Sequence, residues 1–254
     1  MSWAWPPATS SNEVGMAFFQ LVIALGVLAA SPLSTASQEN VDVQARIAVV
    51  QAGTHKAAPK PASANVVLWL NPDPAVTGAS FQSAAPGHFR MEQKNKKFNP
   101  HLLVVPVGSS VEFPNLDPFF HNVFSQFNGK RFDLGLYEAG SARVVRFDHE
   151  GISYLFCNIH SEMAAVVVTL RTPYYAIAKG SGAVEFHDIP AGDYEMHVWG
   201  EGADAKELEA LTRRVHITSS QRDLGTIQLS VPGSLPPHKN KFGEDYKPDP
   251  IQSY

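Results

Sequence analysis

Hydrophobic residues between positions 87 and 171 fall into short runs that are separated by Gly, Pro, Asn and Asp. Short β-branched runs bounded by such turn residues are typical of strands. The pattern predicts about seven or eight strands with a turn roughly every 8–12 residues, which favours a β-sandwich. The clearest of the expected strands are 101–107, 111–113, 121–124, 144–147, 154–156 and 164–170.

The same pattern of short apolar runs separated by turn residues continues on both sides of this segment. Residues 41–50 are strand-like, and the continuous apolar run Val66–Leu70 is interpreted as a buried strand. Residues 231–254 are rich in Pro, Lys and Asp and are expected to form an irregular tail. The predicted fold class is therefore all-β. The remaining expected elements are strands at 174–177, 184–186, 195–199, 214–217 and 224–229 and a short helix at 204–211.

An apolar stretch of different character lies near the amino terminus. Residues 16–30 are almost entirely apolar and lead into Ser34-Thr35-Ala36, a small-residue cleavage pattern. The run is too short to span a bilayer comfortably, so residues 1–36 are predicted to be a signal peptide, with an uncleaved membrane anchor as the alternative. Translation could begin at Met1 or at Met16. In either case the protein is exported, and we expect a periplasmic or secreted chain with no membrane span after cleavage.

Composition and charge limit the classes of function that the chain can have. Apolar residues make up 44% of the chain, which is enough for a buried core, and 18 Gly and 19 Pro suit a fold with many turns. The net charge is −4 and no basic block is present. The sequence therefore lacks the electrostatic footprint of a nucleic-acid-binding protein.

The candidate chemistry centres on Cys157, the single cysteine of the chain. An exported protein folds in an oxidising compartment, yet one cysteine cannot form an internal disulfide. Metal ligation explains this lone thiol best, because coordination keeps the sulfur as an occupied thiolate. His160 and Met163 follow in the same short stretch, and His121 lies upstream at the start of an expected strand.

Together these side chains form a ligand set with a clear preference. A soft thiolate, two imidazoles and a weak thioether select copper in electron-transfer sites. Taken singly, a buried thiol, a core histidine and a packed methionine are ordinary structural residues. Their joint occurrence, in this order and after an export signal, predicts one type 1 copper ion held by His121, Cys157, His160 and Met163.

Residues 87–171 also contain five short motifs, which are Phe98-x-Pro100, Gly108-x-x-Val111, Asn115-x-Asp117, His121-Asn122 and Cys157-x2-His160-x2-Met163. On these motifs the segment resembles a cupredoxin of the plastocyanin–amicyanin group, and its cysteine loop resembles the short amicyanin type. The resemblance implies a Greek-key β-sandwich that holds copper at one end.

The resemblance implies a role for each residue of the site. It makes His121, Cys157 and His160 the equatorial ligands and Met163 the axial ligand. The Asn122 side chain would link the two ligand loops and hold the thiolate in place. His160, as the ligand nearest to solvent, would be the electron port.

Two residues of the loop depart from the family pattern. Ser161 occupies a position where a proline often follows the histidine. Glu162 stands next to Met163 and is a competing axial ligand, which would change the colour and the potential of the site. The choice between these two axial ligands is open at the level of sequence.

Residues 172–230 contain the motif Phe186-x-x-Ile189-Pro190-Ala191-Gly192-x-Tyr194-x-x-x-Val198-Trp199. On this motif they resemble a carboxypeptidase-regulatory-like or transthyretin-like β-sandwich, with an unrelated Greek-key extension as the alternative. These residues alone would form a small core. We therefore hypothesise that segment 87–171 is inserted into an Ig/transthyretin-like sandwich built from 41–86 with 172–230. Hydrogen bonds of Val66–Leu70 made only within the copper segment would refute this.

These observations favour an exported copper protein that carries single electrons between redox protein partners. The combination of segments resembles bacterial methylamine-utilisation-like proteins, a description that does not imply amine oxidation. No enzymatic activity is expected, because protein ligands fill every copper position. A copper storage or delivery protein is one alternative, for which ready metal exchange is expected. A surface binding or scaffold module is the other, for which partner binding should survive loss of metal.

Overall fold

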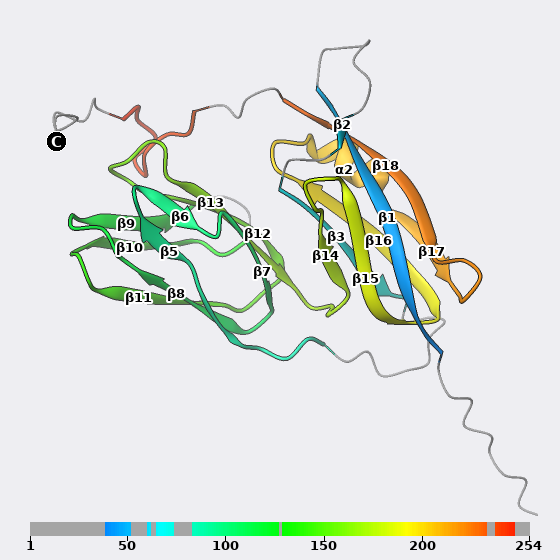
Figure 1. Ribbon diagram of the computed structural model, residues 1–254. Helices are drawn as coiled ribbons and strands as arrows, with labels where there is room; N and C mark the ends of the chain where they lie inside the picture. Colours follow the sequence, from blue (N-terminus) through cyan, green and yellow to red (C-terminus); the bar gives the residue numbers. More distant parts are fainter. Residues whose placement is uncertain are drawn as a thin grey trace, which may run out of the picture. The chain divides into compact units, whose positions relative to one another are not determined.

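The computed structural model describes residues 39–51, 60–61, 65–73, 83–126, 129–232 and 237–246 (Figure 1). The predicted signal peptide, 1–36, lies outside the described residues. The all-β prediction is confirmed, since the described elements are strands apart from one short helix. Among the described residues, no helix has the length and apolar character needed to cross a membrane.

Two sheets form the first sandwich. The larger sheet has the strand order β10-β9-β12-β13-β7 and the smaller one the order β11-β8-β4, while β5 and β6 form a separate hairpin. The larger sheet contains β7 (Leu102–Pro106), β9 (His121–Ser125), β10 (Phe132–Tyr137), β12 (Gly151–Phe156) and β13 (Ala164–Leu170). The others are β4 (His88–Arg90), β5 (Glu92–Lys94), β6 (Lys97–Asn99), β8 (Ser109–Pro114) and β11 (Ala142–Phe147).

The first core consists of side chains from both of these sheets. Phe113 on β8, Phe147 on β11 and Leu155 on β12 are fully buried within it. Cys157 and Met163 belong to the same buried cluster. The two end residues of the loop 157–163 are thus anchored in the core of the sandwich.

Strands from both ends of the chain form the second sandwich. One sheet has the order β15-β1-β18 with β2 on β1, and the other has the order β14-β3-β16-β17. The first sheet contains β1 (Asn40–Gln51), β2 (Lys60–Pro61), β15 (Ala183–Pro190) and β18 (Asp223–Val231). The second contains β3 (Val66–Pro72), β14 (Tyr175–Ile177), β16 (Gly192–Gly200) and β17 (Arg213–Ile217).

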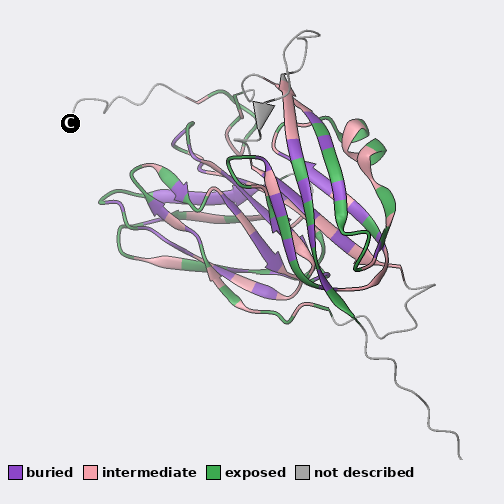
Figure 2. Ribbon diagram, turned by 45° about the vertical axis from the view of Figure 1, so that its right-hand side comes forward, coloured by how far each residue is buried: buried purple, intermediate pink, exposed green. Residues whose placement is uncertain are grey.

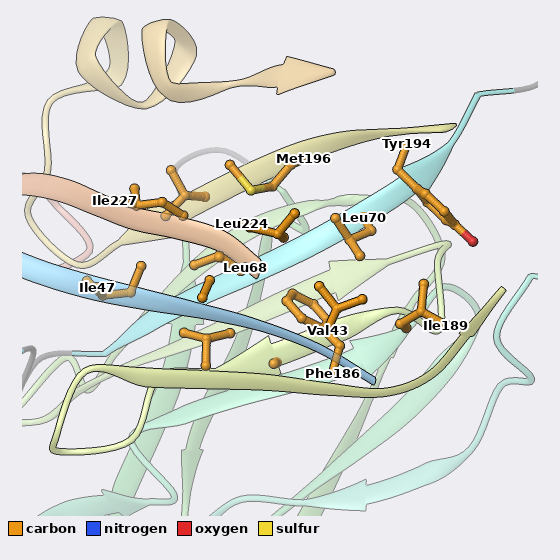
Figure 3. Packing of buried hydrophobic residues seen from close by; sticks show 14 of the residues in the cluster. Val43, Ile47, Leu68, Leu70, Phe186, Ile189, Tyr194, Met196, Leu224 and Ile227 are labelled. Carbon is orange, nitrogen blue, oxygen red and sulfur yellow. The ribbon is translucent and has the colours of Figure 1, made fainter. Parts of the chain in front are cut away.

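The second core is filled by aliphatic and aromatic side chains that project from the facing strands (Figure 3). Val43 and Ile47 come from β1, Leu68 from β3 and Phe186 from β15. Buried and exposed residues alternate along β1, as expected for a strand with one face on a core (Figure 2). The outer face of β1 is therefore polar, whereas its inner face is apolar.

The hydrogen bonds of β3 bear on the insertion hypothesis. β3 pairs with β14 and with β16, and the Leu68–Val198 pair lies in the middle of the second ladder. β1 pairs with β15 and β18. The strands before residue 73 thus pair with strands after residue 174, which is the pairing that the hypothesis requires.

Strands β3 and β13 are buried on both faces. On β3, Val66 and Leu68 point into the second core, whereas Val67 packs in a third cluster with Val166 of β13. On β13, Val167 points into the first core. A strand that is covered on both sides has no polar face, which explains the continuous apolar runs of these two segments.

Two details differ from or refine the sequence prediction. The expected helix at 204–211 is α2 (Ala205–Leu211), and the carboxylate of Asp204 caps it by accepting the N–H groups of Lys206 and Glu207. β10 is not among the strands that the sequence predicts. A bulge around Gly135, whose φ is +67°, interrupts its alternation, so the strand has no period that the sequence reveals.

Candidate metal centre

The cysteine loop and the start of β9 meet at one end of the larger sheet. β9 and β12 are antiparallel neighbours, with Phe124 opposite Phe156. His121 begins β9 and Cys157 directly follows β12, so antiparallel pairing places them at the same end. The β12–β13 ladder ends at the pair Phe156–Ala164, which makes residues 157–163 the connecting loop.

The backbone of this loop closes on itself. The N–H of Cys157 donates to the carbonyl oxygen of Met163 at 3.2 Å. The N–H of Met163 donates in turn to the carbonyl oxygen of His160, also at 3.2 Å. These bonds fold the loop tightly and bring the His160 ring back toward the sulfur of Cys157.

Two imidazoles approach one sulfur. Sγ of Cys157 lies 3.6 Å from Nδ1 of His160 and 3.8 Å from Nδ1 of His121, and the three donor atoms lie within 4.8 Å of one another. His121 and Cys157 are 0% exposed and His160 is 9% exposed. A thiol carries a single proton and can donate it to only one imidazole. The approach of both nitrogens therefore suits a shared cation better than a hydrogen bond.

The spacing also agrees with metal–ligand bond lengths. Bonds of about 2.3 Å to sulfur and about 2.0 Å to nitrogen, at an angle of roughly 120°, separate the two donors by about 3.7 Å. The observed separations of 3.6 and 3.8 Å are close to this value. Both sulfur–nitrogen separations are thus compatible with donors that share one first-row transition metal ion.

The protonation states of these groups depend on the burial of the site. Burial raises the pKa of the Cys157 thiol, although the backbone N–H groups of Ile159, Asn122 and His160 act in the opposite direction. Burial lowers the pKa of His121, which favours its neutral form. Metal ligands must be neutral imidazoles and a thiolate. The imidazole is thus ready to bind, and a cation supplies the charge that the buried thiolate needs.

A carboxylate orients the His121 ring from its far side. Oδ2 of Asp117 lies 2.8 Å from Nε2 of His121, and both side chains are buried. This contact assigns the proton to Nε2 and leaves the Nδ1 lone pair directed at the Cys157 side. Burial raises the pKa of Asp117, but the N–H of Lys96 and the His121 ring outweigh it, so the pKa is lower than usual.

The loop that carries Asp117 is organised by Asn115. Its Oδ1 accepts the N–H of Asp117 at 3.0 Å, and its Nδ2 donates to the carbonyl oxygen of Phe119 at 2.7 Å. The carboxylate also accepts the N–H groups of Asn95 and Lys96, which form the β5–β6 turn with left-handed φ angles. Asp117 is therefore fixed on two sides before it contacts His121.

The two candidate axial residues differ in burial. Met163 is fully buried in the cluster that contains Cys157, whereas Glu162 is exposed and accepts a hydrogen bond from the Ser161 hydroxyl at 3.4 Å. The loop backbone therefore directs the methionine inward and the carboxylate outward.

The side chain of Asn122 makes other contacts than those implied by the cupredoxin resemblance. Its Nδ2 donates to Oδ1 of Asp133 at 2.7 Å and to the carbonyl oxygen of Gly135 at 2.9 Å, both on β10. Its buried Oδ1 has no hydrogen-bond partner among the residues that the structure describes. The link to the cysteine loop runs through the backbone N–H of Asn122, which is directed at the sulfur of Cys157.

Some residues of the site have no role that the sequence predicts. Asp117 belongs to one of the motifs, but the motif does not predict its contact with His121. Phe119 packs against both imidazoles, with ring centroids 5.2 Å from His121 and 5.6 Å from His160. Tyr246 donates a hydrogen bond to the carbonyl oxygen of Cys157 at 2.6 Å. No local pattern of the sequence signals these contacts, because Asp117 lies in a loop and a four-residue spacing brings side chains together only on a helix.

No protein-family model and no curated protein matches the chain. Among solved structures, it is similar to a Cu-containing nitrite reductase from Thermus scotoductus SA-01, with 23% identity and a TM-score of 0.31 over 37% of this chain and 24% of that one. The chain therefore spans about a quarter of that reductase.

Two smaller proteins are matched over most of their length. A purple cupredoxin from Nitrosopumilus maritimus is 22% identical, with a TM-score of 0.30, over 32% of this chain and 99% of that one. A reduced mutant of amicyanin is 21% identical, with a TM-score of 0.30, over 34% of this chain and 86% of that one. These structural neighbours are cupredoxins that cover only a small part of this chain. They give no support to a carboxypeptidase-regulatory-like identity for the second sandwich.

Proposed function

We propose that the chain binds one copper ion between His121, Cys157 and His160, with Met163 as the axial ligand, and carries single electrons between redox proteins. The observation that carries this proposal is the approach of two Nδ1 atoms to one buried sulfur, at 3.6 and 3.8 Å. A thiolate with two imidazoles is the donor set of blue-copper electron-transfer sites.

The residues around the donors favour electron transfer over catalysis. Bound copper would supply a one-electron couple between Cu(I) and Cu(II). Asp117 fixes His121, and the backbone bonds of the loop fix Cys157 and His160. Because the donors are held on a rigid sandwich, they need little movement between oxidation states. Met163 is buried in the same cluster as Cys157, so it would be a fourth protein donor, and the four donors would leave no position for a substrate.

A face for the redox partner lies around His160. Of the two histidines, His160 is the more exposed, so it is the proposed electron port. Phe119, whose ring packs against His160, is partly exposed, as are the large apolar residues Phe120 and Ile159. Exposed apolar residues close to a port favour contact with another protein. The partner, and the periplasmic or secreted location that the leader indicates, remain proposals.

The burial of the donors also separates the electron carrier from a copper delivery protein. Delivery requires that a partner reach the ion and exchange ligands, whereas His121, Cys157 and Met163 have no exposed surface. We therefore expect copper to leave slowly, with a half-life that a competing chelator shortens little.

Copper loading of the metal-free protein tests the proposal. One equivalent of Cu(II) should produce an intense visible thiolate-to-copper band and the electron-paramagnetic spectrum of a type 1 site, and ascorbate should bleach both reversibly. Cys157→Ser should abolish the band while the protein still folds. His149→Ala, which removes an exposed histidine on a loop, is the matched control and should leave it intact. A colourless or multiply loaded wild-type protein would contradict the proposal.

The axial ligand is tested by Met163→Leu. Removing a weak thioether donor destabilises Cu(II) more than Cu(I), so the reduction potential should rise while copper is retained. Glu162→Gln, the control at the exposed neighbour, should leave the spectrum unchanged. If Glu162→Gln moves the band and Met163→Leu does not, the axial donor is the carboxylate.

A further inference from the structure

The chain returns to the first sandwich after its last strand. β18 ends the second sandwich at Val231, yet residues 237–246 lie against the cysteine loop and β10 (Figure 1). We call residues 237–246 the strap. The strap has neither helix nor strand, and none of the metal-site motifs of the sequence includes it.

Lys241 anchors the middle of the strap. Its N–H donates to Oδ1 of Asn158 at 3.0 Å, and its carbonyl oxygen accepts from Nε2 of Gln126 at 2.6 Å. Its ammonium contacts the Asp133 carboxylate at 2.7 Å. Asp133 also holds the Asn122 side chain, so this anchor connects the strap to the segment that carries His121.

The strap is shaped before it makes these contacts. Oδ1 of Asn240 accepts the N–H groups of Phe242 and Glu244 at 2.9 and 3.0 Å. The N–H of Asn240 donates to the carbonyl oxygen of Glu244 at 2.9 Å, and Gly243 takes the left-handed φ of +80° that the turn requires. A turn that is organised locally loses less conformational freedom when it docks.

The end of the strap contacts the cysteine itself. The Tyr246 hydroxyl donates to the carbonyl oxygen of Cys157 at 2.6 Å and lies 3.1 Å from Nδ1 of His238. The ring of His238 packs at a tilt against Phe156, the residue before the cysteine, with ring centroids 4.2 Å apart. When Nδ1 of His238 carries the proton, a chain of donors runs from His238 through Tyr246 to the cysteine carbonyl, and each bond polarises the next.

We propose that Tyr246 is a positioning residue for Cys157, and that the strap holds the cysteine loop, residues 157–163, against the first sandwich and screens it from solvent. The inference rests on the proposed copper function for its effect on the metal. Its effect on the cysteine does not depend on metal. The carbonyl of Cys157 lies beyond the β12–β13 ladder, which ends at Phe156, so the ladder does not fix it. A hydroxyl donor supplied from the strap fixes it instead.

The consequence for the site follows from two effects of this hydrogen bond. It restricts rotation of the cysteine backbone, and therefore of the sulfur that the backbone carries. It also withdraws electron density from the cysteine, which weakens thiolate donation and favours the reduced metal. Loss of the bond should loosen the loop and lower the reduction potential.

The first experiment uses the metal-free full-length protein. The rate at which a thiol reagent modifies Cys157 reports how often the loop opens. Tyr246→Phe should increase this rate roughly fivefold, as expected for the loss of one hydrogen bond. Lys241→Ala, which releases the ion pair of the strap with Asp133, should act in the same direction. Tyr174→Phe in the second sandwich and Lys130→Ala at the exposed Asp148 pair are the matched controls and should have no effect.

The second experiment uses the copper-loaded protein. Tyr246→Phe should shift the reduction potential downward, displace the visible band and speed copper loss to a chelator roughly tenfold. If the strap only covered apolar surface, Tyr246→Phe would leave the reduction potential and the visible band unchanged, because the phenylalanine ring would pack as the tyrosine ring does.

The two experiments separate this inference from the proposed function. If the wild type binds no copper but Tyr246→Phe exposes Cys157, the inference about the strap is supported and the proposed copper function is contradicted. If copper binds and Tyr246→Phe matches wild type in thiol rate, potential and band, the strap is overturned and the copper function stands.

Discussion

At the scale of single residues, the site depends on the groups that orient its imidazoles. The Asp117 carboxylate lies 2.8 Å from His121, and Asp148 lies at the same distance from His149. The first pair is buried and the second is exposed. An ion pair in water contributes little because solvent screens it, whereas the buried carboxylate of Asp117 acts directly on the His121 ring. The environment, and not the distance, makes Asp117 part of the site.

This difference gives a prediction for Asp117→Asn. The amide removes a negative charge behind His121 and relaxes the choice of tautomer, so copper affinity should fall by about 10- to 100-fold. The reduction potential should rise, because an anion next to the ligand stabilises the more highly charged Cu(II). Chelator competition and voltammetry measure the two effects. Asp148→Asn changes the exposed pair, and an equal response of both variants would refute the role of Asp117.

At the scale of elements, the larger sheet of the first sandwich is covered on both faces. Val167 of β13 points into the first core, and its neighbours Val166 and Val168 point into the third cluster, which contains residues of β3 and β16. The strand beside the cysteine loop is therefore held from two sides. A rigid β13 keeps the end of the loop at Met163 in one place, which the proposed metal site requires.

Stability measurements on β13 test this arrangement. Val167→Ala and Val166→Ala each remove two buried methyl groups, so each should lower the free energy of unfolding by about 2 kcal/mol. Val144→Ala on β11, where the side chain is 62% exposed, should change it by less than about 0.5 kcal/mol. Urea unfolding of the metal-free protein measures all three. If Val166→Ala behaves like Val144→Ala, the second face of the sheet is not packed.

At the scale of the whole described unit, polar contacts join the two sandwiches. The His101 ring, just before β7, contacts both carboxylate oxygens of Glu201, just after β16, at 2.9 Å. The Asn65 amide donates to the same carboxylate at 2.7 Å, and the Thr172 hydroxyl donates to the carbonyl oxygen of Leu70 at 2.6 Å. The cluster thus ties together segments that lie far apart in the sequence.

The His101–Glu201 pair predicts a dependence of stability on pH. The hydrogen bond to Glu201 raises the pKa of His101; burial raises the pKa of Glu201, but the His101 contact outweighs it and the pKa falls. Because the pKa of His101 is raised in the folded protein, its contact stabilises the fold fully below about pH 6.5. This stabilisation is lost as the pH rises through the pKa of His101 in the folded state. The lowered carboxyl pKa stabilises it above about pH 4.3, and this is lost on acidification. Stabilisation should be greatest between these values.

The measurement is the free energy of unfolding of wild type and His101→Gln between pH 5 and 9. The difference between the two should shrink steadily as the pH rises above about 6.5. His149→Gln, which changes an exposed histidine, provides the control for general titration. If the difference in the free energy of unfolding between wild type and His101→Gln stays constant over this range, the predicted contribution of the His101–Glu201 pair is wrong.

Much of the architecture was readable from local pattern. Strands with one or two buried faces are visible in the sequence through alternation or through continuous apolar runs, as in Val66–Pro72 and Ala164–Leu170. β10 is not, because Asp133 and Gly135 at its bulge break the period. The short helix at Ala205–Leu211 was readable because its residues favour a helix locally, whereas its cap at Asp204 was not predicted. Sequence patterns capture what is decided within a few residues of the chain.

The candidate donors can be read from the chain without its fold: one cysteine, two histidines and a methionine stand in an order that suits a soft metal, on segments whose strands are locally encoded. The groups that surround these candidate donors depend on how the chain folds. Asp117 contacts His121 because the β5–β6 turn and Asn115 fix its loop, and Tyr246 contacts Cys157 because the chain returns from the second sandwich. Ligand identity is a property of side chains, whereas orientation depends on contacts between segments that no local pattern connects.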